Sequence, residues 1–175
     1  AVGLSGGANV ALRAAEECSE VESVTTMAPF LGSGVSGVLF PVLNIIDVVT
    51  FGLFGNLLDK LPRFKKPQTE EMPKTEGTWG NALAMYRVGT QVKSVEVPLQ
   101  VITTEGDPLS GARQARKLLK NSRHGQNIGW YHFGAEDHVK HPMVSPRENS
   151  NPEAVSLIQN IVTRFVENGQ TTSNR

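Results

Sequence analysis

Two hydrophobic periodicities alternate along this chain. Runs rich in apolar and β-branched residues, as buried strands require, lie at 21–28, 97–104 and 127–133. Apolar residues at the three- and four-residue spacing of helices mark four other segments: 8–17, 79–92, 110–120 and 152–168. Ser110 and Asn151 are suitable helix caps, and Gly169 follows the last helix. Strands that alternate with helices predict an α/β fold, a mostly parallel sheet flanked by helices.

One long segment interrupts this alternation. It divides the chain into a core, 1–30 with 94–175, and an insertion, 31–93. Within the insertion, the polar and proline-bearing stretch 62–77 predicts a surface loop.

The most apolar part of the insertion lies at 35–58. Leu39, Leu43 and Ile46 recur there at helical spacing and share one face. Asp47 argues against a membrane span, because an isolated carboxylate is costly at mid-membrane depth. We therefore expect one or two short helices that pack this face against an apolar surface. Contact with a membrane surface is the less favoured alternative.

Composition excludes several classes of function. The 175 residues contain 17 basic and 17 acidic side chains, so no net positive charge favours nucleic acid. Cys18 is the single cysteine, which rules out an internal disulfide. The four histidines do not have the helical spacing of a metal site, so no metal is expected.

The first residues carry a recognisable motif. Gly3, Ser5 and Gly7 form Gly-x-Ser-x-Gly at the end of a short strand and the start of a helix, which is typical of a nucleophile elbow. Small residues at positions 3 and 7 would leave room for the strand to cross the helix closely. The N–H of Gly6, directly after the serine, would face a developing oxyanion. The alternative is a glycine-rich helix start that binds an anion or only packs tightly.

Two further residues complete a catalytic arrangement in the order Ser, acid, His. Asp107 follows one predicted strand and His138 follows the last, so both lie at carboxyl ends of strands, as Ser5 does. Imidazole could take the serine proton, and a carboxylate would fix and stabilise the imidazole. Glu105 is the alternative acid, and His141 is the nearest alternative base.

These pieces resemble the α/β-hydrolase superfamily. The matching motifs are GLSGGA, VPLQVITTEGD and WYHFGAEDH, and the resemblance covers nearly the whole chain. In its general shape the chain is most similar to the lysophospholipase, monoacylglycerol lipase and serine aminopeptidase-like group. The resemblance implies that 31–93 is a helical cap or lid. It also implies a second oxyanion donor after an earlier strand, and no residue here can be assigned that role. A doubly wound sheet needs parallel strands before position 1, so we expect N-terminal strands to be missing.

The motif and the resemblance together lead to an expected reaction. Ser5, His138 and Asp107 would hydrolyse a carboxylic ester, a small molecule that could be lipid-like, through an acyl-enzyme and without a cofactor. Leu39, Leu43 and Ile46 would line a pocket for a fairly apolar acyl group. A peptidase or acyltransferase would use the same three residues, and a non-catalytic binding protein on the same scaffold is the remaining alternative.

Overall fold

The computed structural model describes most of the chain. The described residues are 1–30, 34–62, 64–65, 76–92, 95–105, 107, 112–122, 128–141, 143–146 and 149–168, and of 34–37, 64–65, 76–77, 113–114, 117 and 121 only the backbone. The expected caps Ser110 and Gly169 and most of the loop 62–77 lie outside them. The elements are β1 (Val2–Leu4), α1 (Gly6–Glu17), β2 (Val24–Met27), α2 (Gly34–Val49), α3 (Leu53–Leu58), β3 (Phe64–Lys65), β4 (Glu76–Gly77), α4 (Trp79–Gln91), β5 (Leu99–Thr104), α5 (Ala112–Asn121), β6 (Ile128–Phe133), a 3₁₀ turn at Ala135–Asp137 and α6 (Pro152–Asn168).

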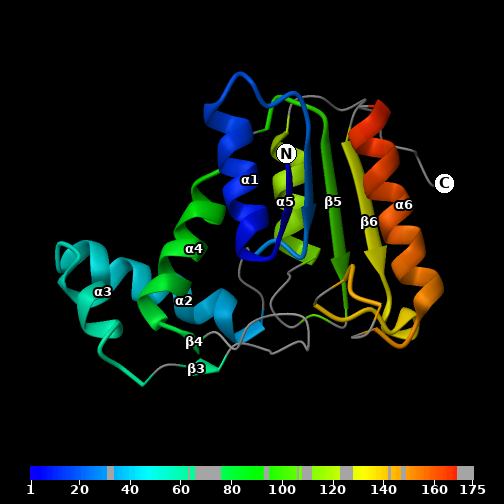
Figure 1. Ribbon diagram of the computed structural model, residues 1–175. Helices are drawn as coiled ribbons and strands as arrows, with labels where there is room; N and C mark the ends of the chain where they lie inside the picture. The colour runs from blue at the N-terminus through cyan, green and yellow to red at the C-terminus, as the bar shows by residue number, and fades with distance from the viewer. Residues whose placement is uncertain are drawn as a thin grey trace.

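A four-stranded parallel sheet forms the centre of the fold. Its order is β1-β2-β5-β6, so β1 and β6 lie at its edges among the described strands. The carboxyl ends of the strands all point to one side, toward the bottom of Figure 1. The expected α/β fold is confirmed, because helices cover both faces of this sheet.

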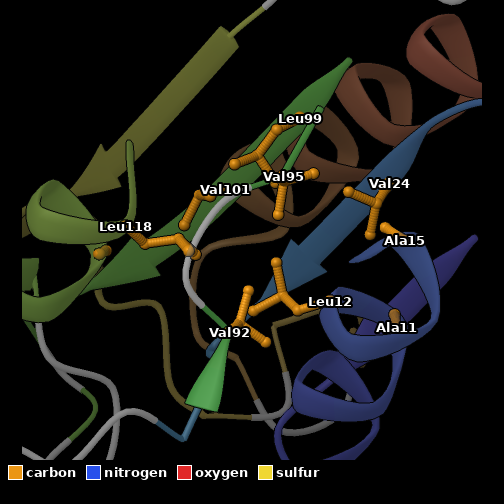
Figure 2. Close-up of a cluster of buried hydrophobic side chains, with 10 residues drawn as sticks. Ala11, Leu12, Ala15, Val24, Val92, Val95, Leu99, Val101 and Leu118 are labelled. Carbon is orange, nitrogen blue, oxygen red and sulfur yellow. The ribbon is translucent and has the colours of Figure 1, made fainter. Parts of the chain in front are cut away.

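The face toward α1 and α5 buries the larger set of aliphatic side chains. Leu12 of α1, Val24 of β2 and Leu99 of β5 are each fully buried there, and Figure 2 shows them converging between the helices and the sheet. Val92 and Val95, which follow α4, join the same cluster. Full burial of each such side chain stabilises the fold by roughly 1.5–3 kcal/mol, so this cluster fixes α1 against the strands.

Helix α6 covers the opposite face. Ala154, Ile158 and Ile161 pack there against Met27 and Ile102 of the sheet. As expected, Asn151 caps this helix: its Oδ1 accepts a hydrogen bond of 3.0 Å from the Ala154 N–H.

The inserted segment is mainly helical. Helices α2 and α3 confirm the helices expected at 35–58. Part of the expected loop instead forms a two-stranded antiparallel pair, β3 with β4. Helix α4, which also belongs to the insertion, packs against α1 of the core and against α2 and α3, so it joins the insertion to the core. None of the described helices is long and apolar enough to span a membrane.

Aromatic side chains hold α2, α3 and α4 together. Phe40 of α2 lies 5.4 Å from both Phe30 and Tyr86, measured between ring centroids. Leu58 and Leu83 are buried beside it, and Leu43 packs against the cluster, partly buried. Leu39 and Ile46 belong to the face that was expected to pack against an apolar surface, but both stay exposed, and only Leu43 of that face packs as expected. The cluster needs only one face of the helix.

A buried charge pair also joins these helices. Asp47 of α2 is 3% exposed, and its Oδ2 lies 2.5 Å from the guanidinium of Arg87 on α4. Its Oδ1 accepts a hydrogen bond from the N–H of Gly55 in α3, and Arg87 also donates to Asn44. The hydrogen bond from Arg87 holds the pKa of Asp47 below its ordinary value of 3.8, with a smaller lowering from Gly55, and together these outweigh the opposing effect of burial.

Replacing Asp47 by Asn should therefore destabilise the inserted helices. Loss of the carboxylate leaves the partly exposed Arg87 without its charged partner and should cost about 1–2 kcal/mol of unfolding free energy at neutral pH. Because the pKa of Asp47 is lowered on folding, its contribution is present above the unfolded pKa and is lost as the pH falls through the folded pKa.

Urea unfolding between about pH 7 and about pH 3 checks this. The difference between wild type and Asp47→Asn should shrink toward acid. A difference that stays constant, or is absent at neutral pH, would show that the pair does not stabilise the fold.

Candidate active site

Ser5 occupies the sharp turn between β1 and α1. Its backbone has φ 56° and ψ −122°, a conformation that is uncommon for a residue other than glycine. The Ser5 N–H donates to the Met27 carbonyl over 2.8 Å, which ties the turn to β2. Such a strained backbone is maintained only where the surrounding structure enforces it. The turn therefore holds Ser5, which is half-buried, in a fixed position.

The glycines around Ser5 have different roles. A Cβ on Gly3 would lie 2.3 Å from the carbonyl oxygen of Gly7, so only glycine allows this crossing. A Cβ on Gly7 would meet open space, which corrects the expectation that residue 7 must be small for packing. A Cβ on Gly6 would lie 3.3 Å from the Met85 sulfur, so α4 contacts the residue directly after Ser5.

Asp107 lies at the end of β5. Its side chain is completely buried, and its Oδ2 is 2.6 Å from Nδ1 of His141. The His141 side chain keeps 21% of its surface exposed. A buried carboxylate on one ring nitrogen fixes the orientation of the ring and favours the other nitrogen as a proton acceptor.

The loop after β6 is fixed on both sides of His141. Val139 and Met143, two residues before and after it, are both buried against the α6 face of the sheet. The Thr104 hydroxyl donates to the Val139 carbonyl over 2.9 Å, and the Lys140 N–H donates to Oδ1 of Asn149 over 2.6 Å. Thr104 ends β5 three residues before Asp107, so one side chain joins the two loops that carry Asp107 and His141.

The structure gives Asp107 a different histidine from the one expected. His138 ends the 3₁₀ turn with φ 52° and ψ 30°, and it is exposed. Its position is set by the turn, where the His138 N–H donates to the Ala135 carbonyl. The 3₁₀ turn and this left-handed residue take up the first part of the loop. The chain therefore reaches Asp107 only at His141.

The neighbouring ionisable groups have other partners. Asp137 accepts a hydrogen bond of 2.8 Å from the Gly134 N–H and so closes the 3₁₀ turn. Glu105 is exposed and lies 3.7 Å from His132, whose Nδ1 contacts the Thr103 hydroxyl at 2.9 Å. Neither carboxylate approaches His141 as Asp107 does. In the described part of the chain, no group of three potential ligand residues could hold a metal ion.

Ser5 lies at the carboxyl ends of the strands, on the same side of the sheet as the Asp107–His141 pair. One strand, β2, separates β1 from β5, so the two strand ends are about 10 Å apart. Among the described residues, the Ser5 hydroxyl makes no hydrogen bond with His132, His138 or His141. Catalytic hydrogen bonds are often long without substrate and shorten when it binds.

The three expected pocket residues of α2 divide into two groups. Leu43 packs into the aromatic cluster around Phe40. Leu39 and Ile46 keep 39% and 38% of their surface exposed, so they are available to a ligand.

Comparison by sequence identifies no relative: no family model and no curated protein matches the chain. Comparison by structure does. A soluble variant of monoglyceride lipase from Saccharomyces cerevisiae, solved with a substrate analog, is 11% identical over 95% of this chain with a TM-score of 0.67. The monoacylglycerol lipase of Paleococcus ferrophilus is 12% identical over 94%, with a TM-score of 0.64.

An esterase domain from a Rhodothermus marinus protein is 15% identical over 94% of this chain, with a TM-score of 0.54. The chain spans 63%, 66% and 59% of the length of these three structures. At such identities the likeness concerns the fold. The chain therefore has the α/β-hydrolase fold, in which monoglyceride lipases and esterases are its structural neighbours.

Proposed function

We propose that this protein is a serine hydrolase of carboxylic esters, with Ser5 as nucleophile, His141 as base and Asp107 as the carboxylate that orients it. The buried Asp107–His141 contact of 2.6 Å carries the proposal. The strained turn at Ser5 supports it, because a nucleophile elbow presents its hydroxyl in this way. His141 takes the role first expected of His138.

The reaction would run through an acyl-enzyme. Ser5 Oγ attacks the ester carbonyl carbon while Nε2 of His141 accepts its proton, and Asp107 stabilises the resulting imidazolium. The Gly6 N–H donates to the oxyanion of the tetrahedral intermediate. His141 returns the proton to the leaving alcohol. Water then attacks the acyl carbonyl carbon while His141 takes its proton. When this tetrahedral intermediate collapses, His141 returns the proton to Ser5 Oγ, and the carboxylic acid and free Ser5 are released.

The expected substrate carries a fairly apolar acyl group. One structural neighbour is a monoglyceride lipase solved with a substrate analog, and another is a monoacylglycerol lipase. In this chain, Leu39 and Ile46 lie on a helix that follows the carboxyl end of β2, next to the strand that leads to Ser5. They are the proposed wall for the acyl chain, and Leu43 supports them from within the aromatic cluster.

Replacing each of the two loop histidines separately by glutamine tests which of them is the catalytic base. His141→Gln should lower kcat/KM for a p-nitrophenyl ester by on the order of 10⁴-fold, as Ser5→Ala should, because each removes an essential part of one unit. His138→Gln is the matched control, and it should stay within about twofold of wild type because its side chain is exposed.

Steady-state kinetics on the protein measures both effects, with circular dichroism to confirm folding. Loss of activity in His138→Gln together with near wild-type activity in His141→Gln would assign the base to His138. The Asp107–His141 contact would then be only structural.

Acyl chain length tests the proposed wall. From acetate to medium-chain esters, kcat/KM should rise by up to about fourfold per methylene, since each buried methylene contributes about 0.8 kcal/mol. Ile46→Asp should flatten this rise and leave acetyl ester turnover nearly unchanged. Ile45→Asp is the control, because Ile45 is 62% exposed on another side of the same helix. A profile that falls steadily from acetate would contradict an apolar acyl pocket.

A further inference from the structure

Helix α4 of the insertion lies very close to α1, the helix that begins after Ser5. A Cβ on the buried Gly89 of α4 would lie 2.5 Å from Nδ2 of Asn9, so only glycine allows this approach. Asn9 is fully buried, and its Nδ2 donates to the carbonyls of Met85 and Phe30, each over 2.8 Å. A buried amide that lost these acceptors would be costly, so α4 is fixed against α1 at this point.

The close packing of these two helices brings the Met85 side chain to the residue that follows Ser5. A Cβ on Gly6 would lie 3.3 Å from Sδ, 3.6 Å from Cγ and 4.0 Å from Cε of Met85. Non-bonded carbon atoms pack at about 3.5–4.0 Å and sulfur is larger, so no methyl group fits between Gly6 and the thioether without a shift. Met85 nevertheless keeps 39% of its surface exposed. It therefore presents an apolar face to a ligand bound beside Ser5.

The direction of proton transfer decides which part of an ester meets this face. His141 returns a proton to the leaving alcohol, so the alcohol must lie on the side of Ser5 that faces His141. That side is toward β5, because Asp107 holds His141 near the end of this strand. Helix α4 lies to the left of α1 in Figure 1, whereas β5 and β6 lie to the right. The acyl group, which points away from the alcohol, therefore extends toward Met85.

We propose that Met85 selects esters whose acyl group is unbranched at the carbon next to the carbonyl. This carbon is the part of the acyl group that lies nearest to Ser5 and Gly6, so a branch on it would meet the thioether. Leu39 and Ile46, the proposed wall on α2, would contact the acyl chain further from the carbonyl. The inference rests on the proposed ester hydrolysis and names the residue that limits the acyl group at its first carbon.

Two esters that differ only in the position of one methyl group test the proposal. The measured quantity is the ratio of kcat/KM for p-nitrophenyl isobutyrate to kcat/KM for p-nitrophenyl butyrate. Met85→Ala should raise this ratio about tenfold, because it makes room for the branch and one carbon in a fitted pocket is worth at least about that factor. Met85→Leu nearly preserves the side-chain volume, so its ratio should stay within about twofold of wild type.

Two controls separate selection of the acyl group from other effects. Thr90→Ala shortens an exposed side chain on the same helix and should leave the acyl ratio at the wild-type value. Met85→Ala should leave unchanged the ratio between ethyl butyrate and isopropyl butyrate, because these esters differ only in the alcohol. A change in this alcohol ratio without a change in the acyl ratio would overturn the proposal. Equal acyl ratios in wild type and Met85→Ala would overturn it as well.

The activity of wild type toward p-nitrophenyl butyrate separates this inference from the proposed function. Where wild type hydrolyses this ester and Ser5→Ala does not, an unchanged acyl ratio in Met85→Ala overturns only the role of Met85. Absence of hydrolysis that depends on Ser5 would overturn the proposed function and the role of Met85 together.

Discussion

The contact between the buried Asp107 carboxylate and His141 is the interaction on which the site depends. A carboxylate removed from water needs partners, and Asp107 has an imidazole nitrogen at 2.6 Å. Bringing His141 there requires the loop after β6 to be fixed by Val139, Met143 and the Thr104 hydroxyl. Those anchors depend in turn on the sheet and on α6. The position of the Asp107–His141 pair therefore depends on the order of the strands in the sheet.

Sequence reasoning predicted most of the core, and for a local reason. The strands are short β-branched runs, and the end of a strand places the next residues at one edge of the sheet. Ser5 and Asp107 could be identified in this way, because Ser5 directly follows β1 and Asp107 lies three residues after the end of β5. A parallel sheet covered by helices follows from the alternation alone.

The histidine could not be chosen from the same pattern. His138 and His141 both follow β6 closely, and the choice depends on a 3₁₀ turn and on burial of Val139 and Met143. The sequence does hold one signal, since the apolar residues Val139 and Met143 flank His141 and predict that this part of the loop is anchored in the core. Contacts from Met85 to Gly6 and from Arg87 to Asp47 join residues about 40 to 80 positions apart, so no local pattern reveals them.

Reaction with a fluorophosphonate tests most directly whether Asp107 and His141 activate Ser5. Mass spectrometry of the digested protein should locate the adduct on Ser5, with a rate that falls in Asp107→Asn by on the order of 10⁴-fold, because the amide cannot stabilise the imidazolium. Absence of an adduct at Ser5, or an unchanged rate of labelling in Asp107→Asn, would contradict the account.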